Sequence, residues 1–353
     1  MVQYFQPMLH FFAASLILSV SFCSRSGEFV FQGKTMGTDY TVRIYSDEIK
    51  LNHLEEKKLH DSIQSELDRI DALMSNWKHE SEISRFNRWP AGRPFPISED
   101  FMTVFSQSDK IFKKTSGAFD PTLNPLIDLW GFGSKTAPGE IPSHAEINKT
   151  LKRTGFQKIR IENSSLVKLH DGIELNVSAI AKGYAVDRTF MVIKNMGFRS
   201  IMVEVGGEIR TGMPPPGKKH WNIGIEKPDY SGKRSIQEII QMQNLSIATS
   251  GDYRNFFRSD DRTYSHILDP KTGMPVQNGM VSASIIGPEC MTADALATSM
   301  LVLGSKKGLE VLKLFPDYEG LLIDKNSSDE LKEYMTPGMQ NYMASHANSG
   351  SAK

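Results

Sequence analysis

The chain has 353 residues, of which 39% are hydrophobic and 23% charged, so it can bury a substantial core as one large domain or two. Its 41 basic residues balance 41 acidic ones, and no overall field favours nucleic acid or an acidic membrane surface. Cys23 and Cys290 are its only cysteines, too few for a disulfide framework and without the Cys/His spacing of a zinc site.

The N-terminal segment carries an apolar run over residues 11–22 (FFAASLILSVSF). The run is too short for a comfortable membrane span but has the size of a signal-peptide core, although no Lys or Arg precedes it. Cys23 follows at once and resembles the lipidated cysteine of a bacterial lipobox, with Phe22 where a small residue is usual. We therefore predict a signal peptide over residues 1–23, ending in a lipidated Cys23 or in a plain cleaved or retained signal.

Beyond this leader, hydrophobic periodicity predicts alternating strands and helices. Residues 38–45 alternate as a strand does, and the apolar positions within 59–74 and 101–112 recur at helical spacing. A hairpin is predicted over 158–169. Further helices are expected near 179–196, 293–303 and 306–315, and short strands near 201–205, 221–226, 236–242, 245–249, 265–268 and 281–286. The pattern indicates an α+β protein, followed by a polar, partly disordered tail over residues 325–353.

Asp294 and Thr298 lie four residues apart in a predicted helix, so a carboxylate and a hydroxyl project from one face. Hard oxygens of this kind suit Mg²⁺, which needs only one or two protein side chains when carbonyls, waters and substrate phosphates complete its shell. Such a pair is also common in Ala-rich helices that bind nothing.

Two other segments place polar groups at the end of a strand or the start of a helix. Ser178 is predicted to be an N-cap whose helix start attracts phosphate, with Lys182 one turn on as a point charge. A capped helix with a solvated lysine explains the same residues. His266, near a strand end, is a candidate general base at near-neutral pH, and Asp269 is close enough in sequence to compete. A packed strand histidine is the structural alternative.

Three segments have weaker patterns. Residues 116–122 form a sharply turned loop whose main chain suits a flat heterocycle, or an ordinary loop. Residues 203–209 carry two glycines in a strand, which indicates a bulge rather than a nucleotide-binding GxGxxG. Arg254 follows a strand and a turn, placed for a phosphate or ring or simply at the surface.

In this order along residues 33–315, these segments resemble the ApbE family. The motifs are GKTMGT (33–38), MSNW (74–77), SEISRFN (81–87), GAFDP (117–121), AKGYA (181–185), VGG (205–207), SHILDP (265–270) and TADA (292–295). The resemblance implies one ApbE-like flavin transferase domain over residues 29–324, a mixed α/β fold with mainly antiparallel sheets flanked by helices.

The resemblance also implies the site residues. The FAD contacts would be Met36, Trp77, Ala118, Phe119, Asp120, Asn176, Lys182 and Ile267. Many family members have Asp at the position of Asn176 and Glu at that of Lys182. Mg²⁺ would be held by Asp294, Thr298 and the backbone carbonyl of Ala179.

Members of the family are exported, Mg²⁺-dependent FAD:protein FMN transferases, and many are lipoproteins. The resemblance implies that a Thr or Ser hydroxyl of a target protein takes the FMN moiety of FAD through a phosphodiester bond, releasing AMP. Alternatives are an FAD pyrophosphatase that gives FMN and AMP, and a non-catalytic flavin-binding lipoprotein. The expected acceptor is a membrane redox subunit of the Na⁺-pumping NADH:quinone oxidoreductase or Rnf type, met at the periplasmic side of the inner membrane.

Overall fold

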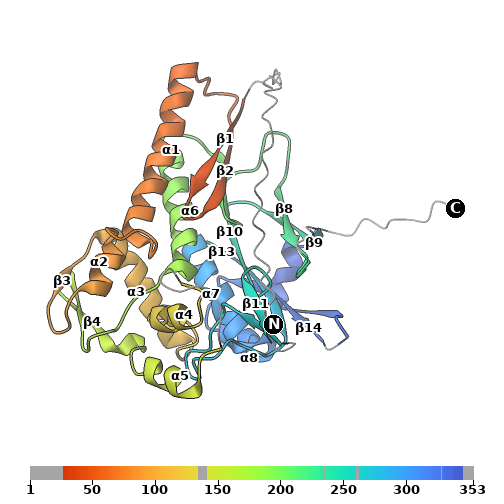
Figure 1. Cartoon of the computed structure of the whole chain (residues 1–353). Helices are drawn as coiled ribbons and strands as arrows, with labels where there is room; N and C mark the ends of the chain where they lie inside the picture. The colour runs from red at the N-terminus through yellow and green to blue at the C-terminus, as the bar shows by residue number, and fades with distance from the viewer. Residues whose placement is uncertain are drawn as a thin grey trace, which may run out of the picture.

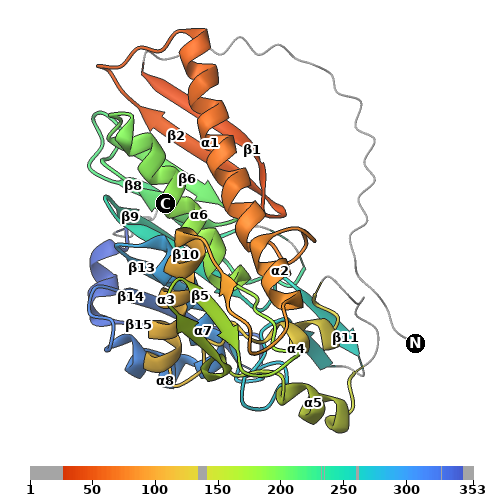
Figure 2. The same ribbon diagram turned by 90° about the vertical axis from the view of Figure 1, so that its left-hand side faces the viewer.

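The computed structural model describes residues 27–133, 141–231, 233, 235–259, 262–326 and 328–344. The predicted signal peptide and Cys23 lie outside this part of the chain. An eight-stranded antiparallel sheet runs through the molecule, with helices on one face (Figures 1 and 2). In spatial order its strands are β1 (Glu28–Thr35), β2 (Thr38–Tyr45), β6 (Ser200–Val205), β7 (Glu208–Thr211), β10 (Ser246–Gly251), β13 (Met280–Gly287), β14 (Glu319–Lys325) and β15 (Leu331–Met335).

Two amphipathic helices form where the apolar spacing predicts them. Helix α1 (His53–Met74) begins with a capping box between Asn52 and Glu55, and its apolar stripe is buried at Leu59, Ile63, Leu67, Ile70 and Met74. Helix α3 (Glu99–Lys114) is capped by Ser98. It ends where Ser116 and Gly117 turn to positive φ of 52° and 83°.

Helices α6 (Ser178–Asn195) and α7 (Cys290–Leu303) lie between this outer layer and the sheet, and α8 (Ser305–Leu312) follows (Figure 2). Helix α7 is buried on nearly every side because it packs against the sheet and against α3 and α6. The carboxylate of Asp187 in α6 accepts the N–H groups of Cys290 and Met291 at 3.1 and 2.9 Å. A carboxylate at a helix N-terminus is favourable, so this contact fixes α7 relative to α6.

The opposite face of the sheet has its own apolar cluster, beneath β8 (Trp221–Glu226), β9 (Ile236–Met242) and the 3₁₀ helix η2 (Pro337–Tyr342). The remaining elements are α2 (Glu82–Arg88), β3 (Phe95–Pro96), α4 (Asn124–Leu129), α5 (His144–Leu151), η1 (Phe156–Lys158), β4 (Ile159–Glu162), β5 (Ser165–Lys168), β11 (Phe256–Ser259) and β12 (Arg262–Ser265).

The predicted α+β class with mainly antiparallel sheets is confirmed. The segment predicted as a polar, partly disordered tail contains ordered elements. Strand β15 pairs with β14 at the sheet edge, and Met339 is buried under the second face. The sequence did not indicate this strand because it is short and includes the charged residues Lys332 and Glu333. Residues 345–353 lie outside the described chain, and within the part described no helix is long and apolar enough to cross a membrane.

Candidate active site

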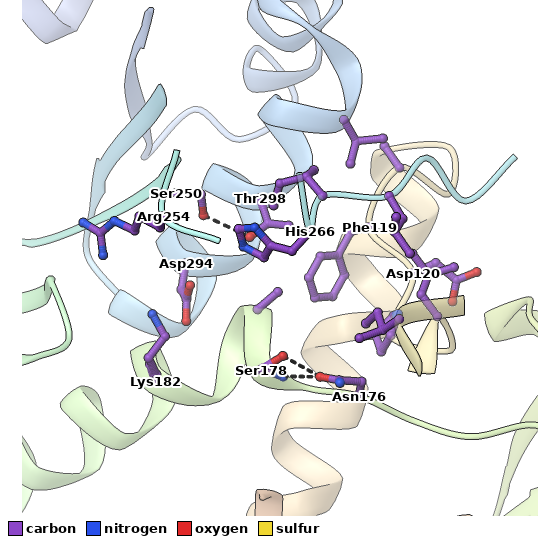
Figure 3. A pocket seen from close by; sticks show the side chains of 18 of the residues that line it. Phe119, Asp120, Asn176, Ser178, Lys182, Ser250, Arg254, His266, Asp294 and Thr298 are labelled. Atoms are coloured by element: carbon purple, nitrogen blue, oxygen red, sulfur yellow. Dashed lines mark hydrogen bonds between the residues drawn. The ribbon is translucent and has the colours of Figure 1, made fainter. Parts of the chain in front are cut away.

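A cavity of about 280 Å³ opens where α6 and α7 meet the ends of the central strands and the loop after α3 (Figure 3). Ten of the thirteen residues predicted from the sequence line it: Ala118, Phe119, Asp120, Asn176, Ala179, Lys182, His266, Ile267, Asp294 and Thr298. Met36, Trp77 and Asp269 do not.

The side chain of Asp294 is held by the backbone of α6. Its Oδ2 accepts the N–H of Gly183 at 3.0 Å, and the residue is only 2% exposed. In a regular α-helix that N–H points at the carbonyl of Ala179, four residues earlier. The close crossing of the two helices requires glycine, since a Cβ at Gly183 would lie 2.4 Å from the carbonyl oxygen of Cys290.

A second carboxylate, Glu208 at the start of β7, lines the same cavity and escaped sequence reasoning. Its Oε1 lies 2.7 Å from Nζ of Lys182, while its buried Oε2 has no hydrogen-bond partner among the residues that the structure describes. The only sequence signal was its place after the glycine pair at 206–207. Lys182 is therefore paired, not the solvated lysine of the structural alternative.

The electrostatics of this cluster are dominated by burial. Burial raises the pKa of Asp294 to about 7, and the negative charge of Glu208 adds to the rise, while Lys182 opposes it. Burial by itself would lower the pKa of Lys182, but the charges of Glu208 and Asp294 outweigh it and raise that pKa. One ammonium faces two carboxylates, and the positive charge of Arg254 also acts to lower the pKa of Asp294.

Thr298 lies one turn beyond Asp294, and its hydroxyl is 3.0 Å from that of Ser250 at the end of β10. Arg254 lies at the cavity wall, where it donates to the carbonyl of Gly206 at 3.2 Å. Hydroxyls and a cation thus flank the carboxylates, as a charged phosphate ligand would require.

His266 lies between Thr298 and Phe119 in Figure 3. Its Nδ1 is 2.9 Å from the carbonyl of Asn255, which can only accept, so Nδ1 carries the proton and Nε2 keeps a lone pair. Burial lowers the pKa of His266 to about 4, and the positive charges of Lys182 and Arg254 add to this. The imidazole is therefore neutral at physiological pH, as a general base must be.

Asp269 does not reach the cavity. Its Oδ1 accepts the N–H of Lys271 at 2.8 Å, and its carbonyl accepts that of Gly273 at 2.8 Å. These bonds close the turn before residue 274. Of the two candidate bases, only His266 faces the site.

The start of α6 differs from the prediction. Ser178 is the first helical residue rather than the N-cap, and the N-cap Val177 makes no side-chain bond. The Oδ1 of Asn176 instead accepts the N–H of Ser178 at 3.0 Å and also its hydroxyl, and Nδ2 of Asn176 donates to Asn124 at 3.1 Å. An Asn two residues before a free N–H satisfies it as well as a serine cap does, which sequence spacing could not distinguish.

The loop of Phe119 and Asp120 is braced locally. Oδ1 of Asp120 accepts the N–H and the hydroxyl of Thr122 at 2.8 and 2.6 Å, and burial raises the pKa of this carboxyl. The carbonyl of Pro121 accepts the N–H of Asn176 at 2.7 Å. The loop and the start of α6 therefore form one wall.

Two predicted flavin contacts lie away from the lining. Met36 adopts a φ of 48° in the turn between β1 and β2 and packs partly against the main core. Trp77 is 73% exposed, an unusual state for so large an apolar ring. Its neighbour Asn76 donates to the carbonyl of Leu175 at 2.8 Å, which ties this segment to the residue before Asn176.

A buried set of carboxylate and hydroxyl oxygens, a neutral imidazole and nearby cations defines an enzyme that acts on a charged phosphate ester. The model of the ApbE family matches residues 36–322, and the chain belongs to this family.

Named relatives agree in length as well as in sequence. The FAD:protein FMN transferase of Vibrio cholerae is 37% identical over 339 residues, covering 94% of this chain and 97% of the relative. That of Escherichia coli K12 is 33% identical over 326 residues and covers 90% of both chains. The solved structure of the flavin transferase ApbE from Vibrio cholerae superposes with a TM-score of 0.81 at 35% identity, covering 89% of this chain and 99% of that one.

Proposed function

We propose that the protein is an FAD:protein FMN transferase that requires Mg²⁺ and moves the FMN moiety of FAD onto a Thr or Ser hydroxyl of a target protein. The single observation that carries the proposal is the placement of Asp294, Thr298 and His266 in one cavity of a chain whose relatives bear that name. A flavin dinucleotide brings a flat ring system and a diphosphate, and the cavity has the Phe119 wall for the first and the polar cluster for the second.

The oxygen set matches a hard divalent cation. Asp294 and Thr298 offer a carboxylate and a hydroxyl, and the N–H of Gly183, four residues after Ala179 in α6, donates to Asp294. Burial raises the pKa of Asp294 and the charge of Glu208 adds to the rise, while Oε2 of Glu208 has no hydrogen-bond partner among the described residues, so both carboxylates offer oxygen to a cation. No three or more His, Cys, Asp or Glu side chains cluster as a metal site among the described residues, which suits a cation that also takes oxygens from the substrate.

When bound, Mg²⁺ would neutralise charge on the diphosphate and orient it. The acceptor hydroxyl attacks the phosphorus of the FMN phosphate, a new P–O bond forms, and the bond to the bridging oxygen of the diphosphate breaks, so AMP leaves. Nε2 of His266 takes the hydroxyl proton, since Nδ1 is held as a donor by Asn255. Lys182 and Arg254 supply positive charge near the phosphates.

The test is to incubate the purified protein with FAD, Mg²⁺ and an acceptor protein, and to measure in-gel flavin fluorescence and free AMP. A fluorescent acceptor with AMP released in equal amount supports transfer. Release of FMN and AMP without labelling would replace transfer by hydrolysis of FAD, and binding of FAD without either product would leave a flavin-binding protein.

We further propose that the acceptor is a membrane redox subunit of the Na⁺-pumping NADH:quinone oxidoreductase or Rnf type, and that the enzyme meets it on the periplasmic side of the inner membrane through a lipid on Cys23. The lipid anchor is supported by the apolar run at 11–22 followed by that cysteine, and the acceptor class by the resemblance to the ApbE family. Mass spectrometry of the mature N-terminus tests the anchor: a diacylglyceryl-modified Cys23 is expected, and an unmodified N-terminus would contradict it.

A further inference from the structure

The cavity holds one partly buried amine, that of Lys182, with two carboxylates that compete for it. The charges of both Glu208 and Asp294 act on Lys182, and Figure 3 shows the side chains of Lys182 and Asp294 turned toward each other. The ion pair of 2.7 Å is made with Glu208 alone. Within the described part of the chain, the side chain of Asp294 accepts a hydrogen bond only from the backbone N–H of Gly183.

The pairing of Lys182 with Glu208 affects whether Asp294 is free to bind a cation. Removing the carboxylate of Glu208 would leave the ammonium of Lys182 without its ion-pair partner, so Lys182 would turn toward the carboxylate of Asp294, whose charge also acts on it. If the ammonium of Lys182 paired with Asp294, it would neutralise the carboxylate that the proposed Mg²⁺ needs. The ammonium and Mg²⁺ are both positive and would repel each other at one carboxylate.

We propose that Glu208 is a positioning residue that holds Lys182 away from Asp294 and so keeps the Asp294 carboxylate open for a divalent cation. The inference rests on the proposed Mg²⁺ site. Glu208 acts through Lys182: its Oε1 is paired with the ammonium, and it reaches the site from β7 rather than from the helix that carries Asp294 and Thr298.

The proposed role predicts changes in cation affinity that a purely structural role, or a role as a direct ligand, does not predict. Glu208→Gln removes one negative charge from the site and frees Lys182 to pair with Asp294. The double variant Glu208→Gln/Lys182→Met also removes one positive charge, so the net charge around the site returns to its wild-type value and Lys182 no longer competes for Asp294.

The experiment is calorimetric titration of each folded, FAD-free variant with Mg²⁺, and separately with Mn²⁺ as a tighter-binding probe. Glu208→Gln is expected to weaken cation affinity about tenfold or more, and the double variant to recover to within about threefold of the wild type. Lys182→Met alone should bind the cation at least as tightly as the wild type. Glu204→Gln is the matched control: this carboxyl lies in the adjacent strand, accepts the N–H of Gly207 at 2.8 Å and does not line the cavity, so its affinity should not change.

The outcomes separate the possible roles. Unchanged affinity in Glu208→Gln would overturn the proposal. A double variant as weak as the single one would also overturn it and make Glu208 a direct ligand. Weaker cation binding by Lys182→Met would also overturn the proposal, and this test does not require the Glu208 variants to fold. If the wild type bound neither cation while still transferring FMN, the metal premise of the proposed function would fall, and this inference with it; failure of the Glu208 variants alone leaves that function standing.

Discussion

The N–H of Gly183 in α6 donates to the carboxylate of Asp294 in α7, at 3.0 Å, across the crossing of the two helices. This bond sets the direction of the proposed metal ligand, and it is made by the residue four positions after Ala179 in α6. It exists only because the helices approach so closely that a side chain at residue 183 would strike the backbone of Cys290.

Replacing Gly183 by alanine should therefore destabilise the protein, although alanine has the higher helix propensity. Alanine normally stabilises a helix by about 1 kcal/mol relative to glycine. In Gly183→Ala, the backbone clash should instead lower the free energy of unfolding by about 1–3 kcal/mol and weaken Mg²⁺ binding, as measured by denaturant unfolding and calorimetry. Gly308→Ala in α8 is the control, because its Cβ meets chiefly the flexible Met300 side chain and the site lies elsewhere. Equal effects of the two changes would contradict the account of the crossing.

Cation binding should depend on pH through Asp294. Its pKa is raised to about 7, so protons compete with Mg²⁺ below that value, and the apparent affinity should fall about tenfold between pH 8 and pH 6. Asp294→Asn should bind weakly, with a flat profile, and lose transfer. A wild-type affinity that stayed constant over this range would argue against Asp294 as the ligand.

The same group should affect the stability of the metal-free protein in the opposite sense. Because the folded pKa lies above the unfolded value of about 4, the stabilisation from protonating Asp294 is complete below pH 4 and is lost as pH rises through 7. The difference in free energy of unfolding between wild type and Asp294→Asn isolates this contribution. From pH 5 to pH 8 the free energy of unfolding of the wild type should fall relative to that of Asp294→Asn, and added Mg²⁺ should reverse this trend.

His266→Ala should lower the rate of FMN transfer by about 10²–10⁴-fold with FAD affinity within about twofold of wild type, because only the proton acceptor is lost. The rate of acceptor labelling measures FMN transfer, and titration with FAD measures the affinity. Since the pKa of His266 is about 4, its neutral form is present throughout pH 6–8 and should not set the acid limb of the rate profile. Asp269→Asn should keep transfer, because its side chain closes a turn outside the cavity; a large loss there would reinstate Asp269 as the base.

Trp77→Ala should weaken FAD binding about tenfold while leaving the melting temperature nearly unchanged, because a side chain that is 73% exposed has little packing to lose. Trp77→Phe should recover most of the affinity. Trp89→Ala is the reverse control: Trp89 packs edge-on against Phe95 at 5.3 Å, so its loss should lower stability without changing FAD affinity. Both are followed by flavin fluorescence and thermal melts.

Local patterns in the sequence determined the periodic elements and much of the candidate site. The apolar stripe of α1 and the Asp294–Thr298 spacing require no knowledge of distant residues, since both follow from 3.6 residues per turn. The order of short motifs then indicated the family, which its sequence model confirmed.

Contacts between distant segments were decided only by the tertiary structure. Glu208 and Lys182 are joined across the cavity, the crossing of α6 and α7 directs Asp294, and burial moves the pKa of His266 to about 4. The polar residues of β15 became ordered because β14 offered them an edge. Burial and long-range pairing depend on how the whole chain packs, whereas spacing along a helix or strand depends on neighbouring residues alone, and so only the second could be derived from the sequence.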